Sequence, residues 1–258
     1  MTAPASAAPL LYYEPRITVL ARPSFTTPEH LGVSWQGASP AGTRLAEFAG
    51  RLCYMSQHNP AGRATRDYLE NIKKQGHGSV LEHANYTLLY EGVSRSLTHE
   101  LVRHRAGFAY SQLSQRYVDE KDASFVVPPA VAGDEALESA WRSQVDGALA
   151  SYIALVEQLM ERYAWVGDKV HRRKMAREAA RGVLPNSTET KIVVTGNARA
   201  WRTMLELRSS EGAELEIRRL AVATLRLLAA EAPGFFSDFE IYEGEDRREA
   251  ARVAFHKV

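Results

Sequence analysis

Cysteine is nearly absent from this chain of 258 residues, since Cys53 is the only one. A single thiol excludes a disulfide within the chain and a metal site built from several thiolates. Scarce cysteine is typical of a reducing compartment, so we expect a cytoplasmic location. Long apolar runs are missing as well, because no stretch approaches the roughly 18 apolar residues of a membrane span. We therefore expect no membrane association.

Excess charge of either sign is also missing. The 32 Lys and Arg residues balance 31 Asp and Glu residues, which leaves a net charge of +1. A nucleic-acid-binding domain usually carries a clear basic excess, so no nucleic-acid partner is expected. The first residues are small and apolar but lack the basic start of a signal peptide, and we interpret them as a disordered tail. The remaining composition, 45% apolar and 24% charged, is that of an ordinary globular protein.

Helical periodicity outweighs strand patterns along the chain. Apolar residues at three- and four-residue intervals predict helices over residues 43–55, 65–75, 93–105, 135–163, 168–183, 198–208 and 211–231. Runs rich in β-branched and aromatic residues predict strands over residues 12–20, 84–92, 125–129 and 188–196. We expect Thr43 and Asn197 to cap their helices, and residues 135–163 to form a core helix. The strand-forming regions are too far apart in the sequence to form a hairpin.

These patterns predict an α+β fold in a single domain of residues 1–258. The tails at residues 1–10 and at about 241–258 are expected to be loosely ordered.

The densest set of polar side chains lies between Arg103 and Tyr117. Arg103, His104 and Arg105 stand together, and a short link containing Gly107 follows them. The next residues are hydroxyls, amides and another arginine, namely Ser111, Gln112, Ser114, Gln115 and Arg116. An arginine presents a planar fork that matches phosphate and carboxylate oxygens two at a time. The segment therefore indicates a site for a flat, polar, anionic small molecule.

A plainer interpretation of the triplet stands beside this one. Val93, Leu97 and Leu101 are spaced as on one face of a helix, which would place Arg103–Arg105 in its last turn. Cations are favoured at helix C-termini, so a basic end alone carries little functional meaning. The run of amides and hydroxyls after the triplet favours the functional interpretation.

A second informative stretch runs from Gly76 to His83. Its glycines allow tight backbone geometry, and His77 and Ser79 supply polar side chains. His77 and His83 match no regular metal-ligand spacing, so no metal site is expected. A turn between helix and strand, capped by Ser79, is the structural alternative to a binding site. Residues 168–183 are strongly basic, which usually means a solvated face and otherwise an attraction for anions.

The sequence resembles the flavin-dependent thymidylate synthases, the ThyX family. The Arg-His-Arg triplet, eight residues and then Ser114 within Ser-Gln-Leu-Ser-Gln-Arg-Tyr resemble the signature of that family. The Gly-His loop at residues 76–79 resembles a second family block. Residues 184–201 and 205–219 resemble two more, so the resemblance runs from about Arg44 to Phe239.

The resemblance implies a mixed sheet flanked by long helices and a homotetramer with active sites shared between subunits. It also implies the conversion of dUMP to dTMP. Methylenetetrahydrofolate would be the carbon donor, and FAD reduced by NADPH the hydride donor.

It further implies roles for particular residues. The cofactor-binding residues would be His77, Ser79, Arg103, His104, Arg105, Gln112, Asn197, Arg199 and Thr203. The substrate-binding residues would be Glu100, Arg103, Gln112, Leu113, Ser114, Gln115, Arg116, Lys191 and Arg208. Arg208 would also be catalytic, because its charge against the uracil ring would stabilise negative charge that develops there.

Three positions depart from the family pattern. Lys191 stands where an arginine is usual, so a planar fork becomes a point charge. Thr203 replaces a frequent His or Asn, and Cys53 replaces a frequent serine near the flavin.

Two rival functions belong to other classes. A nucleotide- or RNA-binding module would need aromatic side chains interleaved with the basic ones, and Tyr110 and Tyr117 are too few. A metal-dependent hydrolase would have to use His77, His83, His99 and His104.

Overall fold

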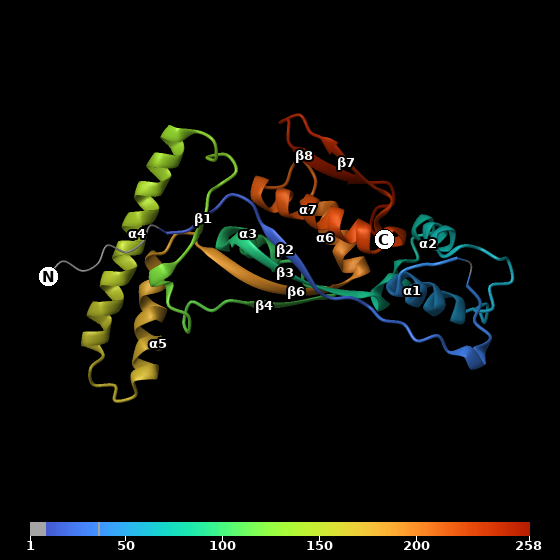
Figure 1. Cartoon of the computed structure of the whole chain (residues 1–258), viewed down its shortest axis with the longest axis horizontal. Helices are drawn as coiled ribbons and strands as arrows, with labels where there is room; N and C mark the ends of the chain where they lie inside the picture. The colour runs from blue at the N-terminus through green and yellow to red at the C-terminus, as the bar shows by residue number, and fades with distance from the viewer. Residues whose placement is uncertain (1–8, 36) are drawn as a thin grey trace. The chain divides into compact units, whose positions relative to one another are not determined.

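The computed structural model describes residues 9–35 and 37–258, so most of the expected N-terminal tail lies outside the described residues (Figure 1). The chain forms two compact units. Of the described residues, the first unit holds residues 9–16 together with Tyr90–His99 and Ser111–Ile192. The second unit holds Ile17–Leu89, Glu100–Tyr110 and Val193–Val258. Among the helices of the described ranges, none combines the length and apolarity that crossing a bilayer requires.

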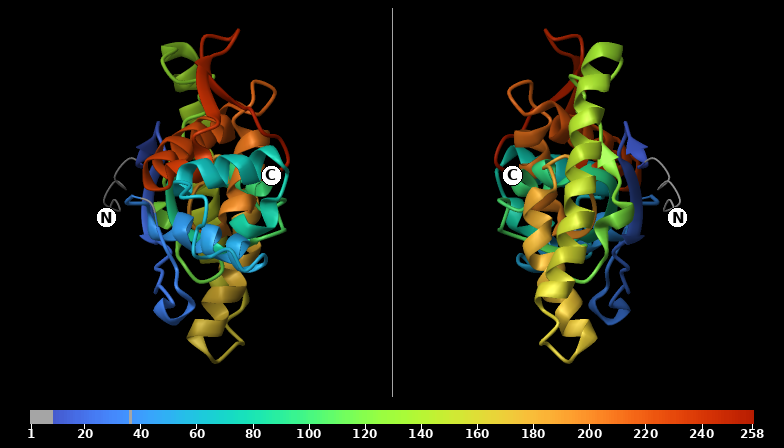
Figure 2. Two further views of the ribbon diagram at one scale, coloured as in Figure 1. Left: turned by 90° about the vertical axis from the view of Figure 1, so that its right-hand side faces the viewer. Right: turned by 90° about the vertical axis from the view of Figure 1, so that its left-hand side faces the viewer.

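Two helices dominate the first unit. α4 (Glu135–Arg162) and α5 (Lys169–Ala180) lie side by side, as Figures 1 and 2 show. Each begins at an aspartate whose carboxylate accepts hydrogen bonds from first-turn N–H groups: Asp134 caps α4 and Asp168 caps α5. A short 3₁₀ turn, η4 (Arg181–Val183), follows α5. The predicted ranges 135–163 and 168–183 are confirmed to within a few residues.

The core of the first unit lies where α4 meets a small sheet. β1 (Leu11–Tyr12) pairs in parallel with β5 (Phe125–Val126), and Leu11 lies opposite Phe125. The cluster consists of Ala123, Phe125, Val145 and Leu149, with Leu11, Trp141 and Ile153 packed against it. α4 buries only its middle, since Leu137 near its start is 50% exposed. The prediction of a core helix is therefore wrong for the ends of α4.

The second unit is mainly helical. Its helices are α1 (Ala41–Leu52), α2 (Thr65–Lys74), α6 (Ala198–Arg208), α7 (Leu215–Glu231) and α8 (Pro233–Phe236), with the 3₁₀ turns η1 (Glu29–Leu31) and η2 (Gly78–His83). Its core includes the fully buried side chains of Leu69, Leu81, Leu88, Trp201, Phe235 and Phe236. The predicted cap of α6 is confirmed, because the Asn197 side chain accepts a hydrogen bond from the Ala200 N–H. The predicted cap of α1 is wrong: the helix begins at Ala41, and Thr43 inside it donates to the Pro40 carbonyl oxygen.

A four-stranded sheet has the order β2-β3-β6-β4. Its strands are β2 (Arg16–Ala21), β3 (Asn85–Ser94), β6 (Glu189–Asn197) and β4 (Phe108–Gln112), and each has residues in both units. α3 (Arg95–Leu101) follows β3 directly, and η3 (Glu120–Asp122) lies between β4 and β5. Helices and small sheets together make the α+β fold that the sequence predicts.

The residues beyond Phe239 differ from the expected loose tail. β7 (Phe239–Glu243) and β8 (Glu249–Val253) form an antiparallel hairpin in which Ile241 lies opposite Ala251. Val258 is only 3% exposed. This hairpin lies outside the four strand regions that the sequence predicts. Ala251 explains part of the order, because its N–H donates to the Ser209 carbonyl oxygen at the end of α6.

Buried charges join α2, α6 and the start of the hairpin within the second unit. The Asp238 carboxylate lies 2.7 Å from Lys73 Nζ and 2.7 Å from Arg202 Nη1, and all three side chains are at most 6% exposed. Burial alone would raise the pKa of Asp238, but the ion pairs with Arg202 and Lys73 outweigh it and hold that pKa below its usual value. Burial lowers the pKa of Lys73.

Candidate functional site

The Arg-His-Arg triplet lies in a turn between α3 and β4. α3 ends at Leu101, so the alternative that placed the triplet in the last helical turn is wrong. The Phe108 N–H donates to the Arg105 carbonyl oxygen, and Gly107 has a φ of 75°. This left-handed conformation favours glycine. A Cβ at this position would also lie 2.8 Å from Ala200 Cβ, so the turn packs closely on α6.

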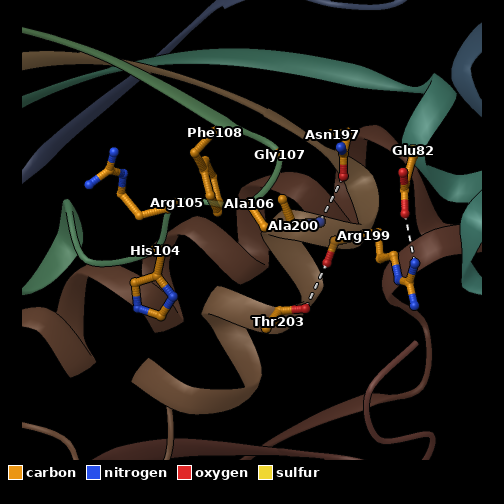
Figure 3. A pocket seen from close by; sticks show the side chains of 10 residues that line it. All are labelled: Glu82, His104, Arg105, Ala106, Gly107, Phe108, Asn197, Arg199, Ala200 and Thr203. Carbon is orange, nitrogen blue, oxygen red and sulfur yellow. Dashed lines mark hydrogen bonds and ion pairs between the residues drawn. The ribbon is translucent and has the colours of Figure 1, made fainter.

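A pocket of about 360 Å³ lies between this turn and the start of α6 in the second unit. Its lining consists of Glu82, His104, Arg105, Ala106, Gly107, Phe108, Asn197, Arg199, Ala200 and Thr203 (Figure 3). In Figure 3, His104 and Arg105 lie on one side of the pocket, and Glu82 and Arg199 lie on the other. The structure thus brings together five of the residues that the sequence predicts as cofactor-binding: His104, Arg105, Asn197, Arg199 and Thr203.

Two arginines give the pocket its positive character. Arg199 Nη1 lies 2.7 Å from a Glu82 carboxylate oxygen, and both side chains are about half exposed. Arg105 is exposed beside Gly107. The Thr203 hydroxyl donates to the Arg199 carbonyl oxygen, so its oxygen can still accept a hydrogen bond. Guanidinium groups and an amide around one cavity favour an anionic ligand such as a diphosphate.

Arg208, at the end of α6, is held by two groups of the second unit. Its Nη1 lies 2.7 Å from Glu100 Oε2, and its Nε donates to His104 Nε2 at 2.9 Å. Because Nε2 accepts this hydrogen bond, His104 is neutral and carries its proton on Nδ1. Burial lowers the pKa of His104, and the Arg208 charge lowers it further. The cluster therefore keeps a fixed guanidinium beside an uncharged imidazole.

Tyr110 fixes the backbone on which this cluster depends. Its hydroxyl donates to the His104 carbonyl oxygen at 2.6 Å and lies 3.1 Å from that of Leu101. Burial raises the pKa of Tyr110 to about 12, so the phenol stays protonated and keeps donating. The sequence reasoning considered Tyr110 only as a stacking platform and missed this role.

His77 and Ser79 line a second pocket of the second unit, with a volume of about 390 Å³. Cys53 and Arg199 also line it, so Arg199 borders both pockets. Gly78 lies between the two predicted residues at the start of η2, whose cap position is His77. The predicted turn between helix and strand is therefore present, but Ser79 lies inside it and does not cap it.

Six of the predicted substrate residues belong to the first unit, namely Gln112, Leu113, Ser114, Gln115, Arg116 and Lys191. The Leu113 N–H donates to the Lys191 carbonyl oxygen, and Arg95 Nη2 donates to the Leu113 carbonyl oxygen, each at 2.9 Å. Lys191 Nζ lies 3.0 Å from Glu91 Oε1 and is 46% exposed. The Gln112 amide lies within 3.4 Å of the Thr190 hydroxyl.

Ser114, Gln115 and Arg116 differ in their exposure. Arg116 pairs with Glu178 of α5 at 2.9 Å and is 38% exposed. Ser114 is half-buried, and its hydroxyl accepts from the Arg116 N–H. Gln115 is buried, with 6% of its surface exposed. Arg103, in the second unit, is exposed next to the triplet turn.

The basic face of α5 is partly structural. Arg177 binds Asp119 at 2.6 Å, and Arg172 donates to the carbonyl oxygens of Ala164 and Val166. In the part of the chain that the structure describes, no group of three or more His, Cys, Asp or Glu residues could hold a metal ion. The described residues therefore give no support to the alternative of a metal-dependent hydrolase built on histidines.

Residues 37–234 match the model of a protein family described as thymidylate synthase complementing protein. A flavin-dependent thymidylate synthase of Mycobacterium sp. (strain JLS) is 50% identical over 244 residues, covering 92% of this chain and 94% of the relative. The enzymes of the same name from Mycobacteroides abscessus and Mycobacterium tuberculosis (strain ATCC 25177 / H37Ra) are 49% and 48% identical over 238 residues. Each alignment covers 92% of this chain and 94% of the relative.

Proposed function

The chain belongs to the family of the flavin-dependent thymidylate synthases, and we propose that it converts dUMP to dTMP with FAD as its cofactor. Methylenetetrahydrofolate is the carbon donor and NADPH the reductant in this proposal, and the reaction takes place in the cytoplasm. The observation that carries the proposal is the pocket of about 360 Å³ whose lining includes His104, Arg105, Asn197, Arg199 and Thr203.

The chemistry of this lining fits a flavin dinucleotide. Arg105 and Arg199 can neutralise a diphosphate, and Arg199 lies at the start of α6, where the helix dipole favours negative charge. Gly107 lets the triplet turn approach α6 more closely than a residue with a side chain would allow. Gln112 and Arg103 complete the cofactor-binding set, and His77 and Ser79 belong to the neighbouring pocket that Arg199 also borders.

Bound FAD, once reduced, would supply the hydride that the uracil ring takes up at carbon 6. The protein would hold the substrate and the cofactor in position and supply the electrostatic field around them. Arg208 lies against the uracil ring in this proposal, where its guanidinium stabilises the negative charge that develops during the reaction. Glu100 and His104 keep that guanidinium oriented, because each already accepts a hydrogen bond from it. The neutral state of His104 matters here, since an imidazolium could not accept that bond.

The remaining residues hold the nucleotide. Ser114 and Arg116 bind the phosphate of dUMP, and Lys191 adds a point charge where relatives use an arginine. Glu100, Arg103, Gln112, Leu113 and Gln115 complete the substrate set. A homotetramer with active sites shared between subunits is part of the proposal.

One absorbance spectrum of the purified protein tests the proposal. We expect the oxidised flavin bands in the visible range, their bleaching by NADPH without oxygen, and dTMP after dUMP and methylenetetrahydrofolate are added. A colourless protein that takes up no added FAD contradicts the proposal. The RNA-binding alternative predicts instead that the protein binds single-stranded RNA and shows no flavin bands.

A further inference from the structure

The last residues of the chain lie on the loop that carries His77 and Ser79. A Cβ built on Gly78 would lie 2.9 Å from the main-chain carbonyl carbon of Val258 and 2.9 Å from Arg199 Nε. Gly78 is buried, and Val258 is 3% exposed. Three parts of the second unit therefore meet at one point: the loop, the arginine that borders both pockets, and residues 255–258, which we call the strap.

One face of α6 holds the strap in place. Arg202 Nη2 donates to the Phe255 carbonyl oxygen at 3.0 Å. Glu206 accepts at 2.9 Å from the His256 ring and at 3.2 Å from the Lys257 N–H. Arg199, Arg202 and Glu206 follow the three- and four-residue spacing of a single helix face.

These anchors lie beside groups that the proposed function uses. Arg199 is one turn from Arg202, and Arg208 ends the same helix. The family match ends at residue 234, so the strap lies outside the part of the chain that the family model covers.

We propose that the strap is a positioning segment of the flavin site: it holds the loop of residues 76–79 and Arg199 in place for the cofactor. This inference rests on the proposed function for the identity of the ligand. The contact at Gly78 carries it, because packing that leaves no room for a Cβ transmits any shift of the strap to the loop. Ordering the loop and Arg199 before FAD arrives lowers the entropy that binding costs.

The first test compares the full chain with a chain that stops after Phe255. Hydrogen–deuterium exchange of residues 76–83 is measured without flavin, and the dissociation constant of FAD is measured by titration. We expect faster exchange in this loop, unchanged exchange in α4 and α5, and FAD affinity weaker by about tenfold. Phe255 and the Asp238 cluster remain, so the shortened chain should keep its fold.

Glu206→Ala gives a second route to the same result. It keeps every residue of the strap and removes the two hydrogen bonds that hold His256 and Lys257, so it decides the question even where the shortened chain does not fold. Arg252→Ala is the matched control, because it removes an exposed ion pair with Glu240 in the same hairpin and leaves the strap untouched. We expect this control to match the unchanged protein in both measurements.

Gly78→Ala tests the contact itself. In the full chain the added methyl group meets the main chain of Val258 and Nε of Arg199, whereas the shortened chain lacks Val258 and keeps the flexible Arg199 side chain. The substitution should therefore weaken FAD binding less in the shortened chain than in the full chain.

The outcomes separate this inference from the proposed function. Two results would overturn the role given to the strap: unchanged exchange at residues 76–83 after removal of residues 256–258, or an equal effect of Gly78→Ala in both chains. Failure of the unmodified chain to bind FAD overturns the proposed function. The exchange measurement needs no flavin, so it still shows whether the strap orders the loop of residues 76–79.

Discussion

Arg208 offers the sharpest test of how this site works. Two of its nitrogens are engaged, by Glu100 at 2.7 Å and by His104 at 2.9 Å, and the side chain is 21% exposed. Removing one electrostatic donor from an active site typically lowers kcat by about 10² to 10³, which corresponds to about 2.7–4 kcal/mol of transition-state stabilisation. We therefore expect Arg208→Ala to lose about two to three orders of magnitude in kcat.

The same substitution should cost much less in folding free energy. It leaves the Glu100 carboxylate and His104 Nε2 without this partner, but water reaches both groups at the present exposure of the cluster. We expect a loss of about 1.5 kcal/mol, at the low end for a hydrogen bond to a charged group. A domain with about 5–15 kcal/mol of stability stays folded after such a loss. The variant should therefore bind FAD and fail in turnover.

Two further variants separate charge from geometry. Arg208→Lys keeps the charge but offers a compact ammonium in place of a planar fork, so we expect a smaller loss, on the order of tenfold. Arg226→Ala is the control, since Arg226 forms an exposed ion pair with Glu249 in the same unit. The assay is dTMP formation together with the flavin spectrum of each variant. Near-normal turnover in Arg208→Ala, or loss of flavin in step with activity, would refute the role given to Arg208.

Three other perturbations have defined outcomes. Because the pKa of His104 is lowered in the folded protein, its contribution to stability is present above the unfolded pKa of about 6.5 and is lost as pH falls through the folded pKa. His104→Gln keeps an acceptor for Arg208 and should reduce this loss at acidic pH, measured as melting temperature and kcat over a pH series. Asp238→Asn leaves Lys73 and Arg202 buried without their carboxylate and should cost about 3–5 kcal/mol in urea unfolding, whereas Glu240→Gln at an exposed ion pair should cost almost nothing. Gly107→Ala forces an L residue to a φ of 75° and against Ala200, so FAD affinity should fall while the Gly133→Ala control, which has open space around it, keeps normal affinity; equal affinities would contradict the close packing assigned to Gly107.

The elements that the sequence predicts best carry their signals locally. Asp134 and Asp168 cap α4 and α5, and Asn197 caps α6. Each of these helices therefore begins at a residue whose side chain accepts a hydrogen bond from an N–H group of the first turn. The predicted start of α3 is wrong because the prediction did not use a local capping signal. Ser94 accepts a hydrogen bond from the Leu97 N–H and marks the start of α3, whereas the spacing of Val93, Leu97 and Leu101 suggested a longer helix.

The C-terminal hairpin had no such local signal. β8 contains Ala250 and Ala251, and alanine is depleted in strands, so its sequence does not favour an extended conformation. Its order comes from contacts distant in the sequence: the pairing with β7, the bond from the Ala251 N–H to the Ser209 carbonyl oxygen, and burial of both alanines. Packing against the rest of the second unit overrides propensity here.

The candidate site depends even more on contacts between residues that are distant in the sequence. Glu100 lies at the end of α3 and His104 in the turn that follows it, whereas Arg208 lies more than a hundred residues later at the end of α6. No periodicity or spacing connects these segments, so only the resemblance to a family could bring Arg208 to the triplet. The resemblance did not reveal why His104 stays neutral. That follows from Arg208 donating to Nε2 and from burial, which both disfavour a second proton on the ring. The arginine that the proposal assigns to the uracil ring therefore adds to the effect of burial in keeping its neighbour neutral.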